Sequence, residues 1–238
     1  MKPRLLDLFC CEGGAARGYA DAGFDVTGVD IEPQPRYPYT FHLGDAASWP
    51  LDGYDAVHAS PPCEDHSVTM GFGMADRGTG WLLPHTIERL QSSGLPYVIE
   101  NVESRAVKAH MPGAFRLCGS AFGLGACDSK GQYRILRRHR LFLTSFPVAV
   151  PPCTCRGQLV GGIYGHGEQG ANGGRGYGFA ADSAREAMGM PWASRDGCAE
   201  AIPPAYTRFI GEQLMAHVLP FAAAVSSAAQ PTTTEEAS

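Results

Sequence analysis

The stretch LLDLFCCEGGAARGYADAGFDVTGVD, residues 5–30, decides the fold class of this 238-residue chain. An apolar run over residues 5–9 is followed by Glu12-Gly13-Gly14, and small residues then continue from 15 to 22 before Gly23. An apolar run, a glycine pair and a small-residue segment in this order predict a strand, a tight turn and a helix. The chain therefore opens on a βα unit.

The same alternation continues along the chain. Apolar residues 24–29 predict a second strand that ends on Asp30, and further strands are predicted over 55–59 and 96–99, with a helix over 81–90 between them. Strands that alternate with helices indicate an α/β fold with a mostly parallel, doubly wound sheet and helices on both faces. Ligands of such sheets bind at the carboxyl ends of the strands.

Composition limits the class of protein. Hydrophobic residues make up 44% of the chain, charged residues 18%, and the formal net charge is −5, so contact with nucleic acid has to be local. The apolar stretch near the N-terminus is too short for a secretory signal, and we see no transmembrane run. We expect a cytoplasmic protein whose eight cysteines are reduced thiols.

The predicted organisation is one domain over residues 1–221 with a tail over 222–238. Within the domain, residues 141–184 form a reduced region, glycine-rich between 161 and 178, in which apolar side chains thin out. Helical spacing returns over 182–190 and 206–219. The tail is small and polar, and we expect it to be disordered.

Polar groups at the first two predicted strand ends indicate a ligand site. Gly13 and Gly14 lie at a helix N-terminus, which favours an anionic group, although a βα turn without a ligand has the same sequence. Asp30 stands where dinucleotide folds place an acid for ribose hydroxyls, but it can also be a loop or capping residue. Asp45 can accept from an amino group or form an Asx turn.

A second group of residues indicates catalysis. Cys63 follows Pro61-Pro62 directly after a predicted strand, so its thiol is held on a stiff turn at the sheet edge; the alternative is a small buried hydrophobe. Glu100 follows the predicted strand over 96–99, so its carboxyl group is expected at the same sheet edge. The alternative is that Glu100 caps a helix. Arg138 and Arg140 stand at the start of another apolar strand, where the alternation of side chains predicts that both arginines share one face. They either donate to a ligand from that face or form a solvated basic surface.

Taken together and in this order, these segments resemble the cytosine-C5 DNA methyltransferase family, and most closely its compact phage-type members. The set of segments in this order is far more specific than any one segment alone. The matching segments are Asp7-Leu8-Phe9 through Gly13-Gly14, Pro61-Pro62-Cys63, Glu100-Asn101-Val102, Arg138-His139-Arg140, Ala187-Met188-Gly189-Met190-Pro191-Trp192 and Ala201-Ile202-Pro203-Pro204-Ala205.

The resemblance implies a Rossmann-like class I methyltransferase that uses S-adenosylmethionine. It implies that Cys63 adds to C6 of cytosine, that Glu100 donates to N3, and that Arg140 with Arg138 holds O2, with the target base flipped out of duplex DNA. The cofactor-binding residues that it implies are Phe9, Glu12, Gly13, Gly14, Asp30, Ile31, Asp45, Ala46 and Pro62.

The sequence also departs from the family pattern. Cys11 replaces a usual glycine, Glu64 replaces the usual glutamine after the nucleophile, and Glu200-Ala201-Ile202 lacks the usual asparagine. The region where the family inserts its target-recognition domain is short, which leaves two alternatives open: the same chemistry on a free cytosine nucleotide or RNA, and an inactive protein that binds S-adenosylmethionine.

Four cysteines outside these motifs pose a separate question. Cys118, Cys127, Cys153 and Cys155 form either a four-thiolate zinc site that stiffens the reduced region or a set of ordinary thiols. Their spacing is irregular, which favours ordinary thiols. We assign no metal ligand to the catalytic site.

Overall fold

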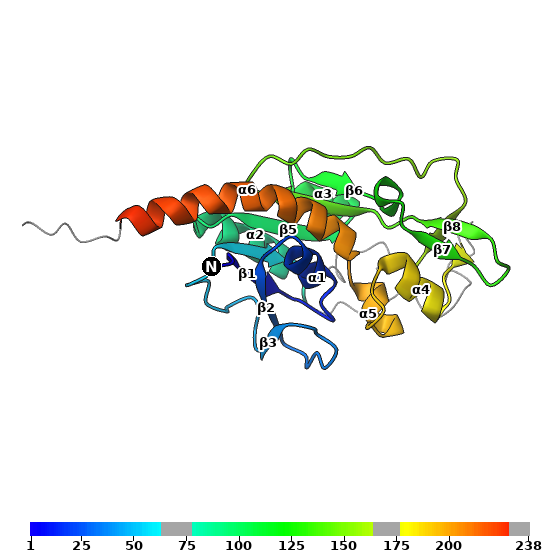
Figure 1. Cartoon of the computed structure of the whole chain (residues 1–238), viewed down its shortest axis with the longest axis horizontal. Coiled ribbons are helices and arrows are strands. Elements are labelled where there is room, and N and C mark those ends of the chain that lie inside the picture. Colours follow the sequence, from blue (N-terminus) through cyan, green and yellow to red (C-terminus); the bar gives the residue numbers. More distant parts are fainter. Residues whose placement is uncertain (63–77, 164–176, 229–238) are drawn as a thin grey trace, which may run out of the picture.

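The computed structural model describes residues 1–62, 78–163 and 177–228. Cys63, the predicted nucleophile, and its neighbours Glu64, Asp65 and His66 lie outside the described residues. Figure 1 shows an elongated molecule in which a large central sheet lies between helices and a smaller sheet lies at one end.

The main sheet has seven strands. Its order is β3 (Thr40–Leu43), β2 (Asp25–Asp30), β1 (Arg4–Leu8), β4 (Ala56–Ala59), β5 (Tyr97–Val102), β9 (Arg140–Thr144) and β6 (Phe115–Leu117). The first five strands run parallel, and β9 is antiparallel to both β5 and β6. The predicted mostly parallel α/β sheet is confirmed.

Both faces of this sheet are covered, as predicted. Helices α1 (Gly14–Asp21) and α6 (Pro204–Ala228) lie side by side on one face (Figure 1), where Tyr19, Tyr206 and Leu214 pack with Leu5 of β1. Helices α2 (Leu82–Ser92) and α3 (Arg105–His110) cover the other face, where Leu83 and Val107 pack with Leu6 and Leu8. Because successive side chains of β1 point into two different apolar cores, the sheet lies between two layers of helices.

The smaller sheet joins two strands of the predicted reduced region, 141–184, to two strands that precede this region in the sequence. Its order is β11 (Tyr177–Gly178), β10 (Val160–Gly162), β8 (Tyr133–Leu136) and β7 (Gly125–Cys127). Leu136 and Phe179 of this lobe pack on α4 (Ala181–Met188), close to α5 (Arg195–Glu200). The described part of this region is therefore a small packed unit, and residues 164–176 lie outside the description.

Two further findings concern the C-terminal part. Residues 222–228, which we predicted to be tail, belong to α6, because the alanines at 222–224 favour continuation of a helix. Residues 229–238 lie outside the described part. Among the described helices, none combines the length and the apolar character that crossing a membrane requires.

Candidate functional site

A cavity of about 390 Å³ opens at the carboxyl ends of β1, β2, β4 and β5. The antiparallel register brings β9 to the same place, since Arg140 at its start pairs with Val102 at the end of β5. The predicted site residues that line the cavity are Phe9, Gly14, Asp30, Ile31, Pro62, Glu100 and Arg140. Residues distant in the sequence thus meet at one sheet edge, where an α/β fold binds its ligands.

Asp30 joins the turns that follow β1 and β2. Its Oδ2 accepts a hydrogen bond from the Cys11 backbone N–H at 2.9 Å, and its Oδ1 accepts one from the Glu32 N–H at 3.0 Å. Each carboxylate oxygen can accept a second bond. Because Asp30 lines the cavity and is 8% exposed, this remaining capacity is available to a ligand.

The turn after β1 has an unusual backbone. Phe9 has φ 59° and Cys11 has φ 44°, a left-handed conformation that few residues other than glycine adopt, and Gly13 has φ 81°. Cys11 is the position at which the resembled family has glycine. The family preference therefore has a conformational reason in this chain.

Glu12 and Gly13, two residues predicted to bind a cofactor, are not among the residues that line the cavity. The carboxylate of Glu12 accepts hydrogen bonds from the backbone N–H of Ser194 at 2.6 Å and from its hydroxyl at 2.7 Å. Gly13 precedes α1, and a Cβ there would lie 2.8 Å from Cδ of Pro38. Both residues shape the turn beside the cavity.

Asp45 and Ala46, also predicted to bind a cofactor, lie apart from the cavity lining as well. Asp45 accepts from the Ala47 N–H at 2.9 Å and from the Ser48 hydroxyl at 2.8 Å, which is the Asx turn that the sequence left open as the alternative. Ala46 is 2% exposed. Local hydrogen bonds therefore account for Asp45.

Acidic side chains dominate the charge of the cavity. Five of them line it against Arg140 as the one described basic residue: Asp7, Asp30, Glu32, Glu100 and Glu200. Burial, followed by repulsion from Asp30, raises the pKa of the Asp7 carboxyl well above its ordinary value. The potential in the cavity favours a ligand that carries positive charge.

Glu100 and Arg140 form a buried pair at the other side of the cavity. Arg140 Nε lies 3.0 Å from Glu100 Oε1, and the two side chains are 9% and 8% exposed. Burial raises the pKa of Glu100, although Arg140, a hydrogen bond from Ser60 and Arg138 act in the opposite direction. Glu100 thus keeps its proton to a higher pH than an exposed glutamate does.

Asn101 holds the turn that leads to Cys63. Its amide Nδ2 donates to the carbonyl oxygen of Pro61 at 3.0 Å, and its Oδ1 accepts from the N–H of Val102 at 2.9 Å. Asn101 is 2% exposed. Pro61 and Pro62, the last described residues before Cys63 in the sequence, both line the cavity.

Arg138 lies elsewhere than its neighbour Arg140. Its guanidinium donates to the carbonyl oxygens of Ile163 at 3.2 Å and Ala199 at 2.6 Å, and the residue is 1% exposed and absent from the cavity lining. The expectation that alternation places the two arginines on one face does not apply, because β9 begins at Arg140 and Arg138 precedes it. Arg138 connects the small lobe to α5.

A buried hydrogen-bonded chain behind the site was not apparent from the sequence. Tyr19 Oη lies 2.9 Å from His58 Nδ1, and His58 Nε2 lies 2.9 Å from Ser60 Oγ, which in turn bonds to Glu100. Burial lowers the pKa of His58 to about 3. A neutral histidine thus supports Ser60 from below, and only a histidine within an apolar strand, AVHA over 56–59, marks it in the sequence.

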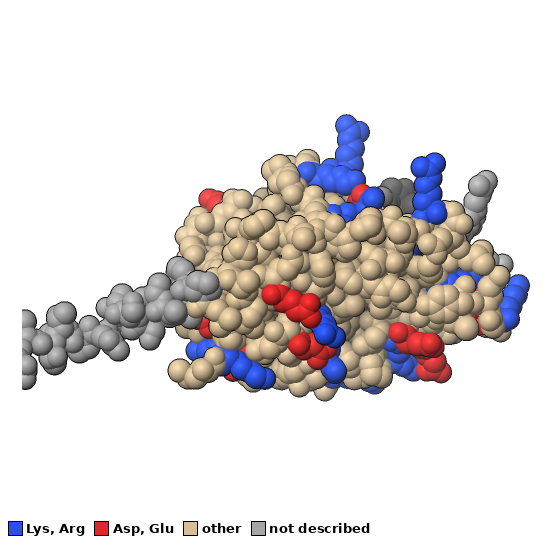
Figure 2. Space-filling model, turned by 45° about the horizontal axis from the view of Figure 1, so that its top comes forward, with Lys and Arg blue, Asp and Glu red and all other residues tan. Residues whose placement is uncertain are grey.

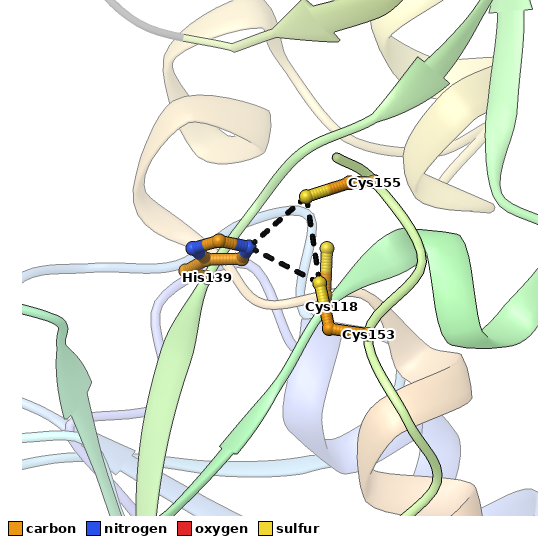
Figure 3. A group of neighbouring side chains, drawn as sticks. All are labelled: Cys118, His139, Cys153 and Cys155. Atoms are coloured by element: carbon orange, nitrogen blue, oxygen red, sulfur yellow. Dashed lines mark hydrogen bonds between the residues drawn. The ribbon is translucent and has the colours of Figure 1, made fainter. Parts of the chain in front are cut away.

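The described cysteines outside the cavity divide differently from the sequence expectation. Cys118, Cys153 and Cys155 gather around His139 (Figure 3), whereas Cys127 is exposed on β7 and is not part of this group. Burial opposes ionisation of Cys153, but hydrogen bonds from the backbone and thiol of Cys155 and from Ser120 and His139 lower its pKa to about 6.

The surface gives no broad basic face in the view of Figure 2. Lysine and arginine side chains there stand apart from one another, with acidic groups between them. This distribution agrees with the net charge of −5. Attraction of a polyanion to this face has to come from local groups.

No protein-family model and no curated protein matches the chain. Solved structures do. A protein described as a DNA modification methyltransferase encoded within an E. coli prophage matches with TM-score 0.58 and 14% identity over 92% of this chain and 100% of that one. The S. pombe Dnmt2 methyltransferase (TM-score 0.55, 11% identity) and the Entamoeba histolytica methyltransferase EhMeth (TM-score 0.55, 9% identity) each match over 93% of this chain and 99% of their own. The chain therefore has the Rossmann-like α/β fold of these methyltransferases.

Proposed function

We propose that this chain is an S-adenosylmethionine-dependent methyltransferase that modifies C5 of cytosine in DNA, with Cys63 as its covalent nucleophile. The observation that carries the proposal is the meeting of Pro62, Glu100 and Arg140 at one cavity that Phe9 and Asp30 also line. Shared fold with a prophage protein described as a DNA modification methyltransferase supports it.

The cavity suits S-adenosylmethionine, which supplies an electrophilic methyl group when bound. Its volume of about 390 Å³ lies in the range of ligand pockets, and its acidic lining favours a sulfonium cation. In this proposal Asp30 accepts from ribose hydroxyls, while Phe9 and Ile31 contact the adenine. Burial, followed by repulsion from Asp30, raises the pKa of Asp7 and so favours its neutral form.

Cys63 carries the covalent step. Its thiolate adds to C6 of the cytosine, so that a C–S bond forms and the electron pair of the C5–C6 double bond moves to C5. That pair would then form the bond to the methyl group, while the methyl–sulfur bond breaks and a neutral thioether leaves. A base then removes the C5 proton, the pair of the broken C5–H bond re-forms the C5–C6 double bond, and the C6–S bond breaks so that the Cys63 thiolate leaves with its electron pair. The chain thereby regains its nucleophile.

Glu100 and Arg140 stabilise the ring during this step. A protonated Glu100 donates to N3 of the cytosine, where negative charge develops, and burial keeps that proton on the carboxyl to a higher pH than usual. Arg140 donates to O2. Arg138 acts through the small lobe, since its guanidinium donates to two backbone carbonyls.

Incubation of the full chain with S-adenosylmethionine and DNA tests the proposal. Duplexes that together contain every short sequence context are digested to nucleosides and analysed by mass spectrometry. We expect 5-methyldeoxycytidine from wild type and none from Cys63→Ser. The proposal would be contradicted if no duplex contained methylated cytosine and no other base were methylated either.

A second candidate substrate is a cytosine outside duplex DNA, in a free nucleotide or in RNA. The observations that favour the free nucleotide are the acidic lining of the cavity, which repels a polyanion such as DNA or RNA, and the separated basic groups in Figure 2, which attract one only weakly. The same assay with deoxycytidylate, cytidylate and RNA as substrates separates the candidates. A product on the nucleotide or RNA and none on any DNA selects the second.

A further inference from the structure

Four metal-binding side chains meet at the junction of the two sheets, away from the cavity. Cys118 directly precedes η3 (Gly119–Phe122), His139 directly precedes β9, and Cys153 and Cys155 lie between β9 and β10. Their ligand atoms all lie within 4.8 Å of one another. Figure 3 shows one nitrogen of the His139 ring facing the sulfur atoms, of which those of Cys153 and Cys155 come from one segment and that of Cys118 from another.

The distances fit a tetrahedral metal site. Cys153 Sγ lies 3.4 Å from Cys155 Sγ, and His139 Nε2 lies 3.6 Å and 3.4 Å from these two sulfurs. In a zinc site with Zn–S bonds of about 2.3 Å and a Zn–N bond of about 2.0 Å, tetrahedral geometry separates the ligand atoms by about 3.5–3.8 Å. Cys153, Cys155 and His139 thus already lie close to the spacing that zinc requires, and the Cys118 sulfur lies within 4.8 Å of their ligand atoms.

A carboxylate stands behind the histidine in the way that metal sites use. Glu103 Oε2 lies 3.1 Å from His139 Nδ1, while Lys108 and Arg116 hold the other oxygen of Glu103 at 2.7 Å and 3.4 Å. A neutral imidazole that donates from Nδ1 to Glu103 presents the lone pair of Nε2 to the thiols. Carboxylates in this position orient the ligating ring and strengthen it as a ligand.

We propose that Cys118, His139, Cys153 and Cys155 bind one zinc ion as a structural site. Three thiolates and one imidazole are a donor set that zinc takes in tetrahedral structural sites, and four protein ligands leave no open position for a substrate. Cys118 is 1% exposed and Cys155 9%, which protects the sulfurs, while the side chain of His139 is 25% exposed. An ion can therefore reach the site from solvent.

The ion would fasten residues 145–159 to the ends of two strands that already pair with each other, since Leu117 of β6 is the partner of Arg140 of β9. Residues 145–159, which contain Cys153 and Cys155, have no helix or strand, and zinc would tie them to the start of β9. His139 stands between Arg138 and Arg140, so the same ion would fix the backbone from which both arginines project. The zinc proposal does not depend on the reaction proposed above.

Metal analysis of the full chain, purified without chelator from zinc-supplemented culture, tests the proposal. We expect about one zinc ion per chain. Removal of the ion should lower the melting temperature by several degrees, and added zinc should restore it. The proposal would be overturned if the folded protein held less than about 0.2 zinc ions per chain, or if Cys153 and Cys155 formed a disulfide and no zinc was bound.

Matched variants identify the ligands. Cys153→Ser with Cys155→Ser should lose the zinc, whereas Cys127→Ser should keep about one ion per chain, because that thiol is exposed on β7 outside the cluster. His139→Ala should lose the ion and His139→Cys should retain it, since four thiolates also form a zinc site. Equal zinc loss in Cys127→Ser and in the double variant would overturn the assignment.

Spectroscopy on the wild-type protein decides the matter even where a variant fails to fold. X-ray absorption at the zinc edge should give three sulfur ligands at about 2.3 Å and one nitrogen at about 2.0 Å. A first shell of oxygen and nitrogen alone would show zinc bound elsewhere and would contradict the site.

Discussion

Arg140 Nε lies 3.0 Å from Glu100 Oε1, and both side chains are less than a tenth exposed. The register of β9 on β5 sets this relationship, since it pairs Arg140 with Val102 and thus brings the start of β9 to the end of β5. A buried carboxyl beside a guanidinium at a cavity wall can supply a proton and a cationic donor to the same ring. The proposed chemistry needs both.

Glu100→Gln should remove most of the activity and leave the fold intact. The amide keeps the shape of the side chain but cannot supply the proton that N3 requires, so we expect kcat to fall by about 10²- to 10⁴-fold. Single-turnover methylation kinetics, with a melting curve for each protein, measure this. Glu88→Gln on the exposed side of α2 is the control and should retain wild-type kcat. A Glu100→Gln enzyme with normal kcat would remove Glu100 from the mechanism.

Activity should also decline as pH rises through the pKa of Glu100. Burial raises this pKa, so the folded protein keeps the reactive proton at pH values where a free glutamate has lost it, and the proton is lost only above the raised value. Ser60→Ala removes a hydrogen bond that lowers the pKa and should shift the alkaline limb of kcat to higher pH. An unmoved limb in Ser60→Ala would contradict the assignment of that limb to Glu100.

Protonation of His58 should weaken the fold in acid. Burial lowers the pKa of His58 in the folded protein to about 3, whereas its pKa in the unfolded chain is about 6.5. The stabilisation of the fold by neutral His58 is therefore fully present above pH 6.5 and is lost as the pH falls toward 3. Each pH unit within this window costs about 1.4 kcal/mol of unfolding free energy.

Comparison with His58→Gln isolates this effect, because buried Asp7 and Glu100 have raised pKa values and weaken the fold in the opposite direction, as pH rises. Urea unfolding of both proteins between pH 6.5 and 4.5 measures the difference. The wild type should lose stability relative to the variant as the pH falls. Parallel curves would mean that His58 is charged or exposed in the folded protein.

Cys11→Gly should stabilise the chain by about 1 kcal/mol, because a cysteine at φ 44° adopts a left-handed backbone that costs glycine little. Gly13→Ala is the matched opposite change, since φ there is 81° and a Cβ would lie 2.8 Å from Pro38 Cδ. Thermal and urea unfolding measure both variants. A loss of stability in Cys11→Gly would show that the thiol makes a contact worth more than the strain.

Most strands and helices of the main sheet could be predicted from the sequence, because runs or regular spacing of apolar residues identify them. The strands and helices of residues 4–30, 56–59, 82–102 and 140–144 follow such runs, and the carboxyl ends of the strands then locate the cavity. Strands β7, β8, β10 and β11 have two to four residues each, too few to show a period. Pairing with distant partners creates them.

Side-chain partners across the chain could not be predicted either. Arg138 was predicted to share a face with Arg140, but its guanidinium donates to the carbonyl oxygens of Ile163 and Ala199. Cys127 was considered with Cys118, Cys153 and Cys155 because all four cysteines lie outside the other motifs, whereas in the fold His139 lies with the other three. These contacts depend on loop geometry, which local sequence patterns do not determine.

The covalent bond between Cys63 and its substrate tests the central claim most directly. A DNA duplex with 5-fluorocytosine at the target position blocks removal of the C5 substituent, so the complex with S-adenosylmethionine should remain covalent and be visible by mass spectrometry under denaturing conditions. Peptide mapping should place the added nucleotide on Cys63, and Cys63→Ser should give no adduct. Production of 5-methylcytosine by Cys63→Ser at the wild-type rate, or by a wild-type chain that forms no adduct, would contradict the account.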